Sequence, residues 1–173
     1  MKTTQNLTRT AVLLALTLAF QALRFIPFIA AMRYNTYLIG TLVNLALIIA
    51  VLSAPLSTSI FISIVTPIVA FIQGHLKFPV MIPVVALGNV IYCVLFYLGA
   101  KRSKSVGIII GSVFKWVFLY MAASFVFKEF VTVPPAMLQT LIATFNIPQI
   151  VTALLGGVLA VYVHRSLPKN LVK

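Results

Sequence analysis

Residues 105–127 have the sequence SVGIIIGSVFKWVFLYMAASFVF, in which Lys115 is the single charged side chain. A helix of this length rises about 34 Å at 1.5 Å per residue. The hydrocarbon core of a bilayer is about 30 Å thick. The run therefore predicts a transmembrane helix with a cation near its middle.

Similar apolar runs lie on both sides of this helix. Of the 173 residues, 62% are hydrophobic and 8% are charged, and the mean hydropathy is +1.14. The last run is too long for one span, and Asn146-Ile147-Pro148 indicates a helix start within it. We therefore predict an all-α integral membrane protein of one domain, residues 1–173. It has six transmembrane helices and a short outer-face element at 136–145; the helices are 8–26, 37–53, 55–73, 79–99, 105–127 and 146–164.

The basic residues predict that both chain ends face the cytoplasm. Lys and Arg accumulate in cytoplasmic loops, and an N-in/C-in arrangement places eight there and four outside. The inner set is Lys2, Arg9, Lys101, Arg102, Lys104, Arg165, Lys169 and Lys173; the outer set is Arg24, Arg33, Lys77 and Lys128. The formal charge of +12 is thereby attributed to topology and to anionic lipid, and not to nucleic-acid binding.

The inventory of reactive side chains is poor. Glu129 is the only acidic side chain, so the acidic relays of secondary pumps and the acid–base pairs of most hydrolases are missing. We expect no catalytic residue and no cofactor. We expect no metal site either, because His75 and His164 fall at opposite ends and Cys93 is the single cysteine. The sequence lacks the glycine-rich P-loop of an ATPase.

Two polar residues are predicted at membrane depth. Lys115 and Asn89 each lie ten residues from the start of their spans, about 15 Å in, on antiparallel helices. Inserting a charged lysine at this depth costs about 2.5–3.5 kcal/mol of free energy. It therefore requires amides such as Asn89, backbone carbonyls, water or a bound anion. A purely structural Asn89–Lys115 bond and a snorkelling lysine are the alternatives.

A second group of polar and aromatic residues is predicted at the outer ends of the helices. Some of them are expected to be interfacial anchors. Together they favour a cleft for an anionic, partly flat solute. With Asn89 and Lys115, the candidate substrate-binding residues are Arg33, Asn35, Gln73, Trp116, Tyr120, Asn146 and Gln149.

Small residues form a stripe on the first span. Ala11, Ala15, Ala19 and Ala22 recur at helical spacing, and such stripes let another helix approach closely in lipid. The partner is either a neighbouring helix of this chain or a separate membrane subunit.

On these features the chain resembles the substrate-binding S components of bacterial energy-coupling factor (ECF) transporters for vitamins. The resemblance rests on six spans in a short chain, basic cytoplasmic ends, and Thr8-Arg9-Thr10-Ala11 leading into the stripe. It implies that Ala11, Ala15 and Ala19 dock on a transmembrane T component. It also implies two separate ATP-binding subunits, a vitamin-like substrate bound from outside, and the bacterial plasma membrane.

Other functions are weighed against this one. A small accessory or assembly subunit without a solute of its own needs no binding cleft. A lipid-acting membrane enzyme is disfavoured by the missing catalytic groups, and a secondary carrier by the missing acidic relay.

Overall fold

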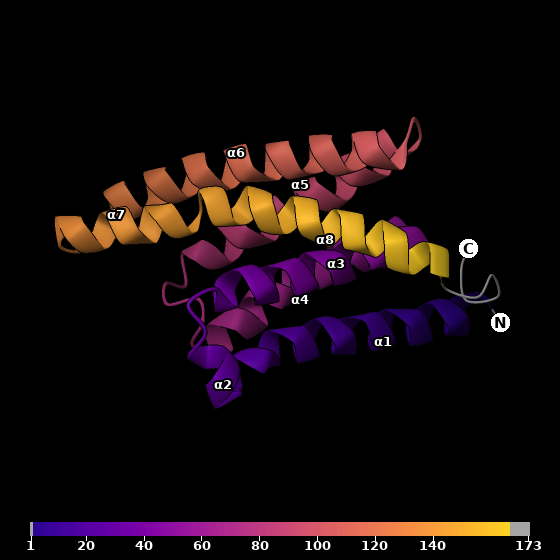
Figure 1. Ribbon diagram of the computed structural model, residues 1–173, viewed down its shortest axis with the longest axis horizontal. Helices are drawn as coiled ribbons and strands as arrows, with labels where there is room; N and C mark the ends of the chain where they lie inside the picture. The colour runs from indigo at the N-terminus through magenta and orange to yellow at the C-terminus, as the bar shows by residue number, and fades with distance from the viewer. Residues whose placement is uncertain (1, 167–173) are drawn as a thin grey trace.

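The computed structural model describes residues 2–166, and this part of the chain is built of helices without strands. The long helices lie side by side along one axis (Figure 1). The elements are α1 (Lys2–Ala22), the 3-10 turn η1 (Leu23–Phe25), α2 (Pro27–Ala30), α3 (Asn35–Ser53), α4 (Leu56–Ile72), α5 (Met81–Ala100), α6 (Lys104–Phe130), α7 (Pro135–Thr144) and α8 (Ile147–Ser166).

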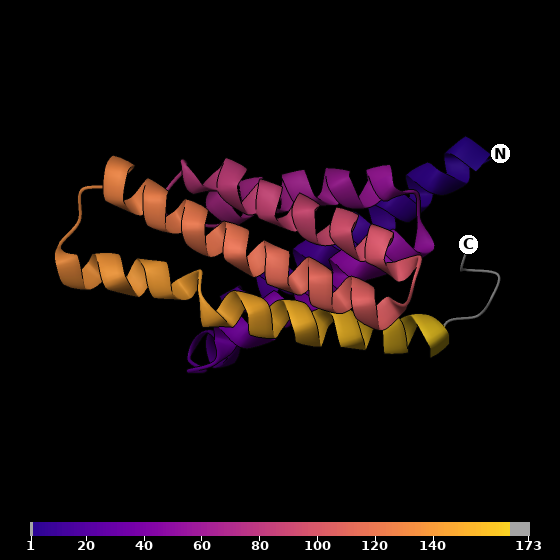
Figure 2. The ribbon, with the colours of Figure 1, turned by 90° about the horizontal axis from the view of Figure 1, so that it is seen from above.

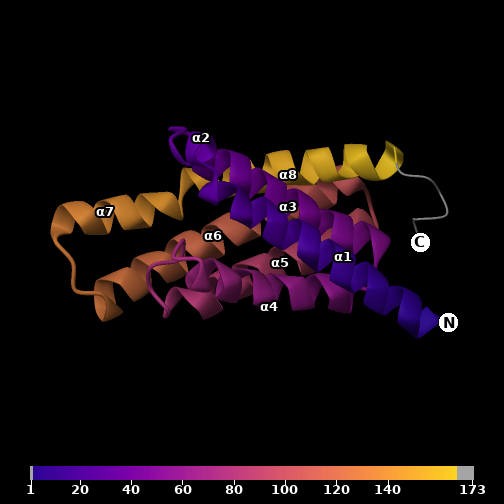
Figure 3. The same ribbon diagram turned by 90° about the horizontal axis from the view of Figure 1, so that it is seen from below.

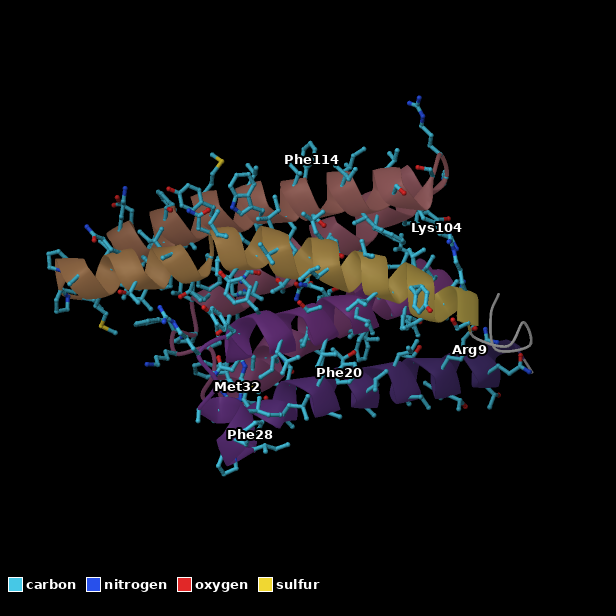
Figure 4. All side chains as sticks on the ribbon, viewed as in Figure 1. Arg9, Phe20, Phe28, Met32, Lys104 and Phe114 are labelled. Atoms are coloured by element: carbon cyan, nitrogen blue, oxygen red, sulfur yellow. The ribbon has the colours of Figure 1, made fainter. Side chains whose placement is uncertain are left out.

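Five segments are long and apolar enough to cross a membrane, namely Thr4–Phe25, Asn35–Ser53, Met81–Ala100, Lys104–Phe130 and Pro135–Ser166. Large apolar side chains project outward from the bundle, as Phe28 and Phe114 do (Figure 4). These features are typical of a protein that lies in lipid. The predicted third span is the 17-residue α4, which at about 26 Å is at the short limit for a span. Six spans therefore stay a prediction.

The break predicted before the last span is confirmed. α7 ends at Thr144 and α8 begins at Ile147, so Pro148 lies in the first turn, where its missing N–H costs no hydrogen bond. The other boundaries differ at their ends. α1 begins at Lys2, before the predicted residue 8, and α6 continues to Phe130. The four-residue α2 was not predicted.

The start of α1 and the end of α8 lie at the same end of the bundle, together with the α5–α6 turn (Figures 1 and 2). Arg9 Nη1 there donates to the Ser53 carbonyl at 3.3 Å, and Ser53 Oγ lies 3.4 Å from His164 Nδ1. This placement agrees with an even number of crossings. Lys169 and Lys173 lie outside the described residues, and the orientation in the membrane stays a prediction.

Glycines bring α5 and α6 into close contact. A Cβ built on Gly107 would lie 2.6 Å from the Phe96 carbonyl oxygen, and one on Gly111 would lie 3.0 Å from the Tyr92 carbonyl oxygen. Backbones this close leave no room for a side chain, which is the packing that small residues permit in lipid. The contact fixes α6, and with it Lys115, against α5.

We expect Gly107→Ala to destabilise the protein by about 1–3 kcal/mol, because the added methyl group must push the backbones of α5 and α6 apart. The midpoint of thermal unfolding in detergent measures this loss. Ile109→Ala, at an exposed position on the same helix, is the control. An equal loss in both variants would contradict the close-packing interpretation.

α1 turns its alanine stripe away from the rest of the bundle. It packs on α3 and α4 with Leu13, Thr17 and Gln21 buried. The stripe residues Ala11, Ala15 and Ala19 are exposed, and the fourth, Ala22, is half-buried. Figure 3 shows α1 at the surface of the bundle, with its outer side uncovered. Of the two partners considered for the stripe, a neighbouring helix within residues 2–166 is therefore excluded for its three exposed alanines.

Candidate functional site

A cavity of about 190 Å³ lies in the half of the bundle nearer α2 and α7. A cavity of about 150 Å³ accepts benzene, so this one has room for a single ring with small substituents. All the long helices contribute to its wall. The lining residues are Gln21, Arg24, Thr36, Ile39, Gly40, Val43, Asn44, Thr66, Pro67, Ala70, His75, Leu76, Val85, Asn89, Lys115, Thr144, Phe145, Pro148, Gln149 and Thr152.

Lys115 lines this cavity and is 3% exposed. Its Nζ donates to Asn44 Oδ1 at 2.6 Å and to Asn89 Oδ1 at 2.8 Å. It also lies 5.1 Å from the centroid of the Tyr92 ring, at a distance typical of a cation–π contact. The ammonium therefore joins α3, α5 and α6 at one point. The equal depth predicted for Asn89 and Lys115 is confirmed by their hydrogen bond.

No acidic side chain balances this cation. The single one in the sequence, Glu129, lies fourteen residues further along α6, about 21 Å away along the helix axis. Arg24 adds a second cation to the cavity wall. An ammonium has three N–H donors, and the two amide oxygens occupy two of them. A carboxylate or another anion would neutralise the ammonium and accept a hydrogen bond from its third N–H.

A chain of side chains holds the two amides in place. Asn44 Nδ2 donates to Thr152 Oγ1 at 3.2 Å, and Thr152 Oγ1 donates to the Gln149 carbonyl at 3.3 Å. Asn44 and Thr152 are both almost fully buried. Gly156 allows this contact, because a Cβ built there would lie 2.6 Å from the Asn44 Cβ. The amide of Asn44 is thus fixed by α8 before any ligand arrives.

The turn η1 and the loop after α4 form another part of the wall. Arg24 and His75 both line the cavity, and the His75 ring packs at 5.2 Å on the ring of Phe25. Burial, and secondarily the positive charge of Arg24, lower the pKa of His75 below its ordinary value of 6.5. The imidazole is therefore neutral at physiological pH.

We expect the protein to lose stability as the pH falls below about 6.5, the ordinary pKa of a histidine. The folded state disfavours the charged imidazole of His75, so the unfolded chain binds more protons in that range. Above this pH, His75 should cause no loss in the free energy of unfolding. The unfolding temperature, measured at a series of pH values from mildly alkaline to mildly acidic, gives the effect. In His75→Gln, the unfolding temperature should depend less steeply on pH. An unchanged slope in this variant would assign the effect to another group.

Three of the nine predicted substrate-binding residues line the cavity: Asn89, Lys115 and Gln149. The other six lie elsewhere. Arg33 is exposed beside the Tyr34 ring, Tyr120 is 39% exposed, and Gln73 lies in the turn after α4. Asn35 Nδ2 donates to the Ala30 carbonyl at 3.0 Å. Trp116 Nε1 donates to Asn146 Oδ1 at 2.9 Å and so ties α6 to the α7–α8 connection.

Several polar lining residues were not predicted. Asn44 is the one amide inside the apolar part of α3, so the depth rule that selects Asn89 applies to it equally. Thr152 and Gln21 carry weaker signals, because threonine is common in membrane helices and Gln21 lies near a helix end. Gln21 is nevertheless 8% exposed, and its Oε1 has no hydrogen-bond partner among residues 2–166.

Within the described residues, no group of three or more His, Cys, Asp or Glu side chains is placed to hold a metal ion. The chain matches no protein-family model, and comparison with curated proteins and with solved structures gives no match.

Proposed function

We propose that this protein is the substrate-binding S component of an ECF-type transporter, which captures an anionic vitamin or related micronutrient at the bacterial plasma membrane. The observation that carries the proposal is Lys115, buried in a cavity wall with two amide partners and no acidic one. A cation held in this way favours an anionic ligand, because a counter-charge offsets the cost of its burial.

The orientation and the partners belong to the same proposal. In a six-span N-in/C-in arrangement, the cavity lies in the outer half and is loaded from outside. The chain has no P-loop, so two ATP-binding subunits supply the energy through a T component. The exposed face of Ala11, Ala15 and Ala19 supports docking of that T component, because small residues let a second helix approach closely in lipid.

Carboxylate-bearing vitamins provide the direct test. Purified in detergent, the protein should unfold at a higher temperature with one such vitamin, and the same compound should be found by mass spectrometry of what co-purifies. A ligand at 100 times its Kd stabilises by about 2.7 kcal/mol. The amide derivative of the same vitamin is the matched control, because it keeps the shape and loses the charge. The proposal would be contradicted if the acid and its amide stabilised the protein equally. It would also be contradicted if no carboxylate-bearing vitamin stabilised it.

A further inference from the structure

The end of the bundle farther from the cavity brings basic side chains of three helices together. All five segments long and apolar enough to cross a membrane have one end there, beside the α5–α6 turn (Figures 1 and 2). In a bundle that lies in lipid, the common end of its spans is at the level of the lipid headgroups. Charged side chains at this end are therefore within reach of those headgroups.

Ser53, the last residue of α3, lies at the centre of the basic group. Arg9 Nη1 of α1 donates to its carbonyl at 3.3 Å, and its Oγ lies 3.4 Å from His164 Nδ1 of α8. Lys104, the first residue of α6, is near enough to His164 for its charge to act on the imidazole. Figure 4 shows Arg9 and Lys104 at this same end. Arg9, Lys104 and His164 are called the basic cluster below.

The cluster keeps hydrogen-bond donors that are open to its surroundings. Within residues 2–166, Arg9 Nε and Nη2 and Lys104 Nζ have no hydrogen-bond partner, and all three residues of the cluster are half-buried. In the same part of the chain, the enclosed side-chain nitrogen and oxygen atoms without a partner belong to Gln21, Gln73, His75 and Ser112 only. The free nitrogens of Arg9 and Lys104 are therefore accessible to a ligand.

No acidic side chain neutralises the cluster. The single one in the sequence is Glu129, which lies 25 residues beyond Lys104 on α6, about 38 Å along the helix axis. Guanidinium and ammonium groups bind phosphate oxygens through short, charge-assisted hydrogen bonds. Apolar side chains adjoin the cluster, since Leu7 of α1 is 70% exposed and Tyr162 of α8 is 71% exposed. An anion with an apolar tail fits both features better than a free phosphate does.

We propose that the basic cluster binds the phosphate of one anionic phospholipid, whose acyl chains lie along α1 and α8. The phosphate accepts hydrogen bonds from Arg9 and Lys104 and so joins α1 to α6. No hydrogen bond links α1 directly to α6 or α8 within the described residues. This site differs from the general attraction of a basic surface for anionic lipid, because it needs particular cations from separate helices. It is independent of the substrate cavity and of the function proposed above.

Phosphatidylglycerol and phosphatidylcholine with the same acyl chains are the probes. Native mass spectrometry of the full chain, released from detergent with increasing amounts of either lipid, gives their relative affinities. Phosphatidylglycerol should bind about fivefold or more tightly than phosphatidylcholine. Arg9→Gln and Lys104→Gln should each weaken phosphatidylglycerol about fivefold, the effect of one basic residue near a membrane surface. Both should leave phosphatidylcholine binding unchanged, which shows that the variants are folded.

Lys101→Gln is the matched control, because it removes the same charge at the same end of the bundle. Lys101 is exposed, and its Nζ lies 5.3 Å from the centroid of the Tyr97 ring on its own helix, α5. This variant should bind phosphatidylglycerol like the wild type.

Three results would overturn the site. Equal binding of the two lipids would remove the role of the phosphate charge. An equal loss in Lys101→Gln and Arg9→Gln would reduce the effect to the general attraction of a basic surface. Displacement of phosphatidylglycerol by inorganic phosphate at equal concentration would assign the cluster to a soluble anion.

Discussion

Lys115→Met is expected to weaken the binding of a carboxylate substrate by at least about 30-fold, because truncating one partner of a buried charge pair costs roughly 2–5 kcal/mol. Methionine nearly keeps the length and shape of the lysine stem and removes only the ammonium. Equilibrium dialysis or calorimetry with the co-purifying ligand gives the Kd. Lys128→Met, at an exposed lysine on the same helix, is the matched control and should bind like the wild type.

The same substitution should leave the empty protein folded. Removing the ammonium saves a burial cost of about 2.5–3.5 kcal/mol, and it loses two charged hydrogen bonds of about 1.5–3 kcal/mol each. The lost bonds exceed the saving by up to about 3.5 kcal/mol, so the unfolding temperature without ligand should fall, and the unfolding transition should remain cooperative. If the Lys115→Met variant bound substrate with the wild-type Kd, Lys115 would have a role in packing only.

Ala15→Trp is expected to abolish uptake in cells and to leave the Kd of the purified protein unchanged. Ala15 is the middle residue of the exposed stripe on α1, and an indole there would hold a docking helix several ångströms away from a surface built for close approach. Uptake of radiolabelled substrate and binding in detergent are measured on the same variant. The two readouts separate docking from recognition.

Val158→Trp controls for bulk in the membrane. Val158 is 56% exposed on α8, outside the stripe, and the added ring there should affect neither readout. Full uptake by Ala15→Trp would exclude this face as the docking surface. Loss of binding in that variant would show instead that α1 transmits strain to the cavity.

The sequence was sufficient to predict that two polar side chains lie at one level of the bundle. Counting from the span ends placed Asn89 and Lys115 at one depth, and the structure joins them at 2.8 Å. The break before α8 was equally accessible, because an asparagine followed by a proline two residues later is a strong local signal. Depth and helix breaks are local properties, so a single sequence contains them.

The direction in which a side chain faces around its helix was harder to predict. Tyr120 lies near the predicted level of the site but is 39% exposed. Trp116, one helical turn earlier, uses its N–H to hold Asn146. In lipid the outer face of a helix is as apolar as its buried face, so the hydrophobic pattern that orients soluble helices is weak here. Gln21 escaped prediction for a different reason, because it lies near the end of α1.

Lys115 also has an electrical consequence. Moving one elementary charge across a potential of 100 mV changes the free energy by about 2.3 kcal/mol. Lys115 has no acidic neighbour, so in the empty site its ammonium adds one positive charge to any movement through that field. A bound monoanion cancels it. Voltage should therefore act on the reorientation of the unloaded protein and much less on that of the loaded one.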